Sequence, residues 1–200
     1  MSGDQTYRTF VAIELPPDVR RRIREHIDRL RSAFPQVCAS WSREDNLHLT
    51  LKFLGEIPIT RIPALSEACS ESIKQIEPFE LIIKDCGTFP PLGKPKVLWI
   101  GIEDADAGAQ TTHLQRLHAA IEDSCAAQGF EREARRYHPH LTIARIREAK
   151  DSRAVAEHHR QTDFAPQTFS VSEVVVFRSE LSSAGSKHSA LSRYRLESKE

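Results

Sequence analysis

The chain has 200 residues, enough for one domain with a sizeable hydrophobic core or for two small ones. Its 28 Lys and Arg residues balance 28 Asp and Glu residues, which argues against a polybasic protein that holds nucleic acid by bulk charge. The hydrophobic content of 40% excludes a disordered chain, and no apolar run approaches the length of a membrane span. The four cysteines are scattered without a CxxC pair, and the N-terminus lacks a signal-peptide pattern. We therefore expect reduced thiols in a cytoplasmic protein.

Apolar periodicity predicts alternating strands and helices. Strands are expected over residues 7–15, 38–42, 46–57, 79–89, 97–103, 138–146, 169–181 and 194–196. Helices are expected over residues 17–34, 60–76, 106–128 and 150–160. A loop rich in Ser and Gly is expected between the last two strands. Because the strands are half polar and no linker divides the chain, the pattern favours an α+β fold with antiparallel sheets over a buried parallel sheet.

One short motif occurs twice, as His48-Leu49-Thr50-Leu51 and as His140-Leu141-Thr142-Ile143. Both copies lie in predicted strands, where alternate side chains point to the same face. Each histidine should therefore share a face with its threonine, while the apolar residues between them pack in the core. The same alternation predicts Phe53 in the core. It also places Arg145 opposite His140 unless the strand ends or bulges there.

Two such strands would line a groove with two imidazoles and two hydroxyls. One histidine alone reads as an ordinary surface residue, but two matched copies favour a functional pair. Histidine titrates near neutral pH, so one ring can act as a general base and the other as a general acid. Threonine hydroxyls can hold phosphate oxygens in line. The sequence predicts no metal site: the pairs His138/His140 and His158/His159 are too isolated to form one.

At these motifs the chain resembles the 2H phosphoesterase superfamily, and within it the RNA 2',3'-cyclic phosphodiesterase family, also called LigT-like or 2'-5' RNA ligase-like. The likeness continues in order through residues 8–13, 41–56, 96–101 and 139–145. It implies one 2H phosphoesterase domain over residues 1–200, built of two intertwined lobes. Each lobe would be an antiparallel sheet with helices packed outside. A pseudo-twofold axis would relate the lobes across a central, positively lined cleft.

The resemblance also implies metal-independent hydrolysis of a 2',3'-cyclic phosphate to a 2'-phosphate, with no cofactor. His48 matches the proton donor and His140 the proton acceptor. Thr50 and Thr142 would hold phosphate oxygens. Three alternatives stay open: 2'-5' RNA ligation, which is the same chemistry reversed, non-catalytic binding of RNA ends, and a metal-dependent hydrolase.

Further substrate contacts are expected from three residues. Arg145 matches a family arginine near the substrate, and Phe10 and Trp99 are aromatic residues that could stack a nucleobase. A basic block before the second motif would either steer an RNA end or lie in a solvated loop; it comprises Arg132, Arg135 and Arg136. The expected partners are RNA ends or small nucleotides with a 2',3'-cyclic phosphate. A monomer is expected, with no obligate protein partner and no membrane attachment.

Overall fold

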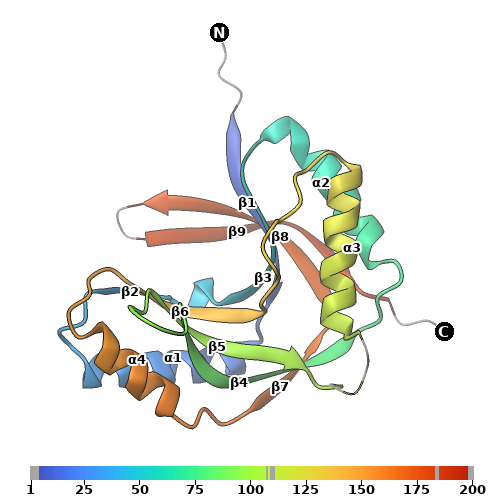
Figure 1. The fold of residues 1–200 in the computed structure, drawn as a ribbon. Helices are drawn as coiled ribbons and strands as arrows, with labels where there is room; N and C mark the ends of the chain where they lie inside the picture. Colours follow the sequence, from blue (N-terminus) through green and yellow to red (C-terminus); the bar gives the residue numbers. More distant parts are fainter. Residues whose placement is uncertain (1–4, 107, 109–110, 183–184, 198–200) are drawn as a thin grey trace.

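Two antiparallel sheets organise the chain in the computed structural model, which describes residues 5–106, 108, 111–182 and 185–197 (Figure 1). The four-stranded sheet has the order β3-β1-β8-β9, with bounds β1 (Thr6–Glu14), β3 (His48–Pro58), β8 (Glu173–Ser182) and β9 (Gly185–Arg195). The five-stranded sheet has the order β2-β6-β5-β4-β7, with bounds β2 (Ala39–Trp41), β4 (Phe79–Phe89), β5 (Val97–Asp104), β6 (His140–Ile146) and β7 (Gln167–Val171).

Helices cover one face of each sheet, and their bounds are α1 (Pro17–Ala33), α2 (Ile62–Ile73), α3 (His113–Ala127) and α4 (Ser152–Gln161). Helices α2 and α3 pack on each other and against β9 and β3 of the four-stranded sheet. Helix α4 packs on β4 of the five-stranded sheet, with α1 beside it (Figure 1). The predicted core positions Val19, Ile23 and Ile27 of α1 are buried. No helix in the described part of the chain is long and apolar enough to cross a membrane.

The chain runs through two similar halves that exchange one strand each. The elements β1, α1, β3, α2 and β4 of the first half correspond in order to β5, α3, β6, α4 and β8 of the second, while β2, β7 and β9 have no counterpart. Strand β4 pairs with β5 of the second half, and β8 pairs with β1 of the first half. This topology confirms the predicted duplicated α+β architecture of antiparallel sheets with helices packed outside. It also makes β3 and β6, the two motif strands, equivalent.

Two predictions for the C-terminal part are wrong. Residues 169–181 do not form one strand, because the chain leaves the five-stranded sheet after β7 and enters the other sheet at β8. The expected loop and short last strand are instead the long strand β9, apart from residues 183–184, which lie outside the described residues. Strand β9 has few buried side chains, so its sequence carries no clear apolar alternation.

Helix α3 begins later than predicted. Residues 107 and 109–110 of the expected helix lie outside the described residues, and α3 starts at His113. Its start is fixed by a capping box: the Thr112 hydroxyl accepts a hydrogen bond from the backbone N–H of Gln115, and the Gln115 side chain accepts one from the backbone N–H of Thr112. Helix α2 also ends earlier than predicted, at Ile73.

An extra residue in β3 reverses its alternation just after the first motif. Thr50 lies opposite Ala12 of β1 and Lys52 lies opposite Val11, so Leu51 has no partner of its own and forms a bulge. Beyond the bulge, Lys52 points into the core and is 4% exposed, whereas Phe53 is 51% exposed. The prediction that Phe53 belongs to the core is therefore wrong.

Strand β6 carries the equivalent bulge. Thr142 lies opposite Trp99 of β5 and Ala144 lies opposite Leu98, which leaves Ile143 as the extra residue. Ala144 is buried, and Arg145 turns to the face that carries His140. The bulge thus removes the conflict between simple alternation and a place for Arg145 beside the second motif.

The buried Lys52 is compensated by a carboxylate of α3. Its Nζ donates to both carboxylate oxygens of Glu122 at 2.8 Å and to the backbone oxygen of Glu131 at 2.8 Å. Both side chains are almost completely buried. Removing one partner of such a pair leaves the other charge without compensation in the interior.

We expect Glu122→Gln to lower the free energy of unfolding by about 3–5 kcal/mol, because it leaves the Lys52 charge buried without its counter-ion. The double variant Lys52→Met/Glu122→Leu should lose much less, since neither charge remains. Urea unfolding followed by circular dichroism measures both changes.

The matched control is Asp123→Asn on the same helix, which removes the exposed ion pair of Asp123 with Arg132. Its cost should stay below about 1 kcal/mol. Equal losses in Glu122→Gln and Asp123→Asn would contradict the role assigned to the buried pair.

Candidate active site

The two motif histidines have the same hydrogen-bond geometry. Nδ1 of His48 lies 2.7 Å from the backbone oxygen of Asn46, and Nδ1 of His140 lies 2.7 Å from the backbone oxygen of His138. A carbonyl oxygen can only accept, so Nδ1 carries the proton in both rings. In the neutral imidazole, Nε2 is then left as the basic nitrogen.

Hydrogen bonds to the threonine carbonyls hold the two motif strands in place. The Tyr137 hydroxyl, just before β6, donates to the backbone oxygen of Thr50 at 3.2 Å. The Ser42 hydroxyl, just after β2, donates to the backbone oxygen of Thr142 at 2.7 Å. Strands β3 and β6 come within 8 Å of each other between Cα atoms, and they meet at the centre of the fold (Figure 1). The first motif is therefore tied to the residue that leads into the second motif strand.

Aromatic rings surround His48 on its sheet face. Phe10 of β1 stacks on the imidazole, with ring centroids 4.6 Å apart. His188 of β9 meets the same imidazole edge to face at 5.2 Å. Phe10 is only 3% exposed and also stacks on Phe177, so its ring packs under His48 and presents little surface to a nucleobase.

The surroundings of His140 follow the same plan. Phe89 meets its ring edge to face at 5.0 Å, and the half-buried Trp99 lies at 6.5 Å. The Trp99 indole lies flat over Gly87, where an added Cβ would come within 2.1 Å of the ring. Glycine at this position is therefore required for the indole to lie beside the second motif.

His188 and Phe89 were not predicted as site residues. The sequence predicts a loop at His188, because β9 has no strong apolar pattern. Phe89 ends a strand whose role in the site depends on the strand exchange between the halves. Knowledge of the strand register would have identified both residues. His188 lies in the sheet that carries His48, and Phe89 lies in the sheet that carries His140.

Burial makes both motif histidines difficult to protonate in the free protein. It lowers the pKa of His48 to about 4, with a smaller contribution from the nearby His188. The pKa of His140 is also lowered, chiefly by burial and then by the charges of Arg145 and His138. In each ring the bond to the backbone oxygen opposes this shift. Both imidazoles are therefore neutral at pH 7 in the unliganded protein.

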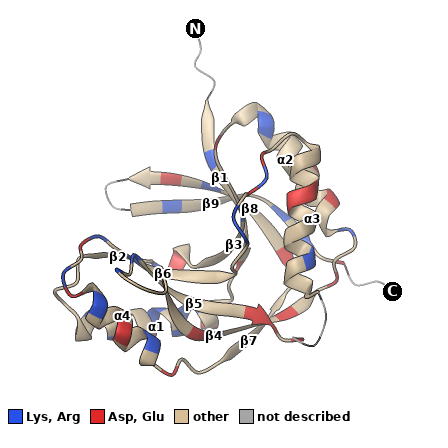
Figure 2. Cartoon of the chain, in the orientation of Figure 1, with Lys and Arg blue, Asp and Glu red and all other residues tan. Residues whose placement is uncertain are grey.

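Charged residues are distributed over both sheets and all helices (Figure 2). Arg145 is exposed and close enough to His140 to affect its pKa. In the predicted basic block, Arg132 forms a surface ion pair with Asp123 at 2.7 Å, and Arg135 and Arg136 are exposed. That these arginines steer an RNA end therefore stays a prediction.

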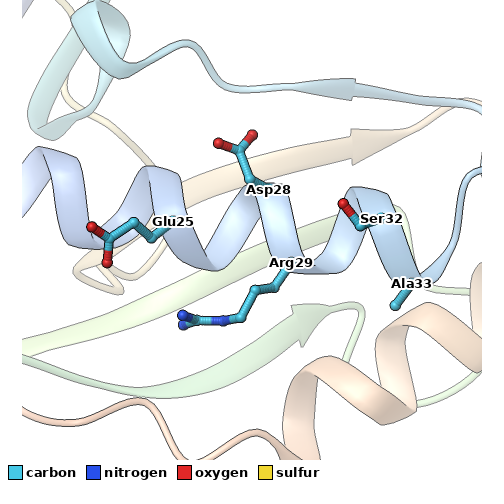
Figure 3. A pocket seen from close by; sticks show the side chains of 5 residues that line it. All are labelled: Glu25, Asp28, Arg29, Ser32 and Ala33. Atoms are coloured by element: carbon cyan, nitrogen blue, oxygen red, sulfur yellow. The ribbon is translucent and has the colours of Figure 1, made fainter.

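A hollow of about 710 Å³ lies on the outer side of α1 (Figure 3). Its lining side chains are Glu25, Asp28, Arg29, Ser32 and Ala33. Acidic and basic groups face it together, and none of these residues belongs to either motif. The hollow is therefore separate from the histidine pair.

Comparison with known proteins finds relatives that match most of the chain. The family model of the 2'-5' RNA ligase superfamily matches residues 16–182. An RNA 2',3'-cyclic phosphodiesterase of Methanothermobacter thermautotrophicus is 30% identical over 190 residues, which cover 94% of this chain and 98% of the relative. One of Thermotoga maritima is 29% identical over 180 residues, covering 89% of each chain.

Among solved structures, Escherichia coli LigT complexed with 3'-AMP superposes with a TM-score of 0.71 at 26% identity, covering 97% of this chain and all of that one. The matching family model covers most of the chain, and the first relative matches over nearly its whole length. The chain belongs to the 2'-5' RNA ligase superfamily.

Proposed function

We propose that this protein hydrolyses the 2',3'-cyclic phosphate of RNA ends or small nucleotides to a 2'-phosphate without a catalytic metal. The observation that carries the proposal is the pair of equivalent imidazoles on β3 and β6. A backbone oxygen holds each ring at Nδ1 and leaves Nε2 as the reactive nitrogen. The names of the similar proteins, RNA 2',3'-cyclic phosphodiesterases, support the same substrate.

In this mechanism a water molecule attacks the phosphorus atom in line with the 3' oxygen. Nε2 of His140 takes a proton from the water, and the new P–O bond forms as the P–O3' bond breaks. Nε2 of His48 gives its proton to the leaving 3' oxygen, which becomes a hydroxyl. The phosphate stays on the 2' oxygen, so the product is a 2'-phosphate.

This division of roles needs His48 to gain a proton when the substrate binds, because burial lowers its pKa to about 4 in the free protein. Burial and then the Arg145 charge lower the pKa of His140, which favours the neutral ring that can accept a proton. Burial and the nearby His188 lower the pKa of His48, and no arginine contributes to the shift. The negative charge of a bound phosphate raises the pKa of a neighbouring imidazole, so His48 can take up its proton when the substrate binds.

We assign the remaining expected residues to contacts with the substrate. Thr50 and Thr142 follow their histidines on the same sheet faces and would hold the non-bridging oxygens. Arg145 would balance the phosphate charge, and the half-buried Trp99 would stack on a nucleobase. Phe10 stacks on the His48 ring and would position that ring without contacting the substrate. The proposal includes a monomer that works in the cytoplasm without an obligate protein partner.

Ligation is the reverse of the same reaction. A terminal 5' hydroxyl would then attack in place of water, giving a 2'-5' bond, and the description of the matching family favours testing it. Incubating the protein with an RNA that ends in a cyclic phosphate and one that ends in a 5' hydroxyl separates the two directions. Non-catalytic binding of RNA ends is disfavoured because both histidines and both threonines are retained.

We expect His48→Ala and His140→Ala each to lower kcat by about 10²–10⁴-fold, since each removes one proton-transfer group. The assay uses an oligonucleotide with a 2',3'-cyclic phosphate in the presence of a chelator. Phosphorus NMR should show a 2'-phosphate as the product.

The control is His158→Ala, an exposed histidine on α4 that contacts Phe34 and no motif residue; its activity should equal that of the parent protein. Near-normal turnover in either motif variant would exclude the two-histidine mechanism. Loss of activity in chelator that added zinc restores would exclude metal-free chemistry.

The pH dependence of kcat/KM should be bell-shaped, with its maximum below pH 6.5. The pH dependence of kcat/KM reflects the pKa values of the free protein, in which burial lowers the pKa of both histidines. The pH profile of kcat should have its maximum at higher pH, because a bound phosphate raises the pKa of both histidines. Initial rates from pH 4 to 9 measure both curves, and a flat kcat/KM profile over that range would contradict the assignment.

The ring protonation can be observed directly. Long-range proton–nitrogen NMR at pH 7 should show His48 and His140 as Nδ1–H tautomers. His159 provides an internal contrast, because its Nε2 donates to the backbone oxygen of Trp99 and it should be the Nε2–H tautomer. Assignment rests on the loss of one signal in each His→Gln variant. An Nε2–H form of either motif histidine would remove the structural basis of the mechanism.

A further inference from the structure

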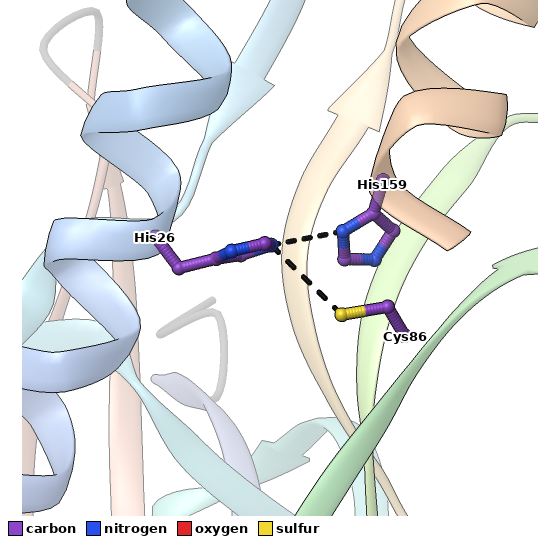
Figure 4. Close-up of side chains that lie close together, drawn as sticks. All are labelled: His26, Cys86 and His159. Carbon is purple, nitrogen blue, oxygen red and sulfur yellow. Dashed lines mark hydrogen bonds between the residues drawn. The ribbon is translucent and has the colours of Figure 1, made fainter. Parts of the chain in front are cut away.

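Three side chains with metal-binding atoms meet on the helix-covered face of the five-stranded sheet. They are His26 of α1, Cys86 of β4 and His159 of α4, and their ligand atoms all lie within 4.8 Å of one another (Figure 4). Nε2 of His26 lies 2.9 Å from Nδ1 of His159 and 4.0 Å from Sγ of Cys86. In the described part of the chain this is the one such group of three or more. It is separate from the two motif histidines.

We propose that His26, Cys86 and His159 form a zinc site that joins α1 and α4 to the sheet. Two imidazole nitrogens and one thiolate sulfur are the ligand set that Zn²⁺ prefers. Bonds of about 2.0–2.1 Å to nitrogen and about 2.3 Å to sulfur in a tetrahedral site place the two nitrogens about 3.3 Å apart, and nitrogen and sulfur about 3.6 Å apart. The two separations that involve His26 Nε2 each need to change by only about 0.4 Å, and the third, between Nδ1 of His159 and Sγ of Cys86, lies within 4.8 Å.

The hydrogen bonds prepare both rings for this role. Nε2 of His159 donates to the backbone oxygen of Trp99 at 2.9 Å, which directs the Nδ1 lone pair to the centre of the cluster. A ligating histidine commonly donates its other N–H to a backbone oxygen in this way. Nδ1 of His26 is buried without a partner, so moving the His26 proton from Nε2 to Nδ1 costs no hydrogen bond at Nδ1. Burial also lowers the pKa of His26 to about 4, which keeps this ring uncharged.

A bulge in β4 directs the sulfur to the same point. Lys84 lies opposite Gly101 and Cys86 lies opposite Ile100, so Asp85 is the extra residue, and it has a positive φ of 60°. That conformation is costly for a residue other than glycine. The bulge turns Cys86 from the motif face to the helices. Cys86 is half-buried, which leaves a path for an ion to enter.

Binding has a defined proton balance. The Cys86 thiol, whose pKa burial raises to about 12, loses its proton to solvent as the sulfur–zinc bond forms. The His26 proton stays on the ring at Nδ1, and both imidazoles remain neutral. One proton is therefore released for each zinc bound. With three protein ligands, a water molecule would complete the coordination.

This site would stabilise the fold and take no part in the phosphate chemistry. It joins three elements far apart in the sequence, at a strand that the first half contributes to the sheet of the second half. The inference does not rest on the proposed function. Activity assayed in chelator tests the motif histidines, whereas the measurements below use no substrate.

The test uses the full chain, freed of metal and titrated with Co²⁺ without oxygen. One equivalent should bind with release of one proton, a thiolate-to-cobalt charge-transfer band and tetrahedral d–d bands, and Zn²⁺ should displace the cobalt without further proton release. Cys86→Ser should lose the charge-transfer band, and His26→Gln should weaken cobalt binding at least tenfold. The matched control Cys38→Ser removes an exposed thiol and should keep the full spectrum.

A second measurement needs no variant. Zinc should slow alkylation of Cys86 in the parent protein at least tenfold and leave the exposed Cys38 unaffected, as measured by mass spectrometry. Cobalt binding without a charge-transfer band, or equal alkylation of Cys86 with and without zinc, would overturn the proposal. Either result would leave the pair His26–His159 as a plain hydrogen bond within the core.

Discussion

One extra residue near the end of each motif decides which face of the sheet the following side chains occupy. A strand normally sends alternate residues to opposite faces, and one inserted residue reverses that order. In β3 the bulge at Leu51 buries Lys52 and exposes Phe53, and in β6 the bulge at Ile143 brings Arg145 to the face of His140. The buried ion pair of Lys52 with α3 is a consequence of the first bulge, and the positive charge beside the second motif is a consequence of the second.

The two histidines are matched in geometry and differ in surroundings. Both donate from Nδ1 to a carbonyl two residues earlier, so both present the same nitrogen for chemistry. His48 packs among Phe10, Phe177 and His188, whereas His140 lies near Arg145. A duplicated scaffold thus supplies two imidazoles with the same hydrogen-bond geometry and unequal neighbours.

Strand exchange between the halves connects the histidine pair to the opposite face of the five-stranded sheet. Strand β4 provides Gly87 beneath the Trp99 indole, while its neighbouring residue Cys86 points the other way, to His26 and His159. His159 in turn holds the backbone oxygen of Trp99. The motif face and the histidine–cysteine cluster therefore share one strand pair, and the position of Trp99 depends on both.

The sequence by itself determined the local features of this protein: strand and helix periodicity, the duplicated motif and, through it, the family. Those signals lie within a few residues of one another, where side-chain spacing decides the outcome. Only the tertiary structure decided the split of residues 169–181 between two sheets, the exposure of Phe53, the burial of Phe10, and the meeting of His26, Cys86 and His159. Each depends on a bulge, a strand exchange or a contact between distant elements, and such pairings follow from how the whole chain packs, which the spacing of neighbouring residues does not encode.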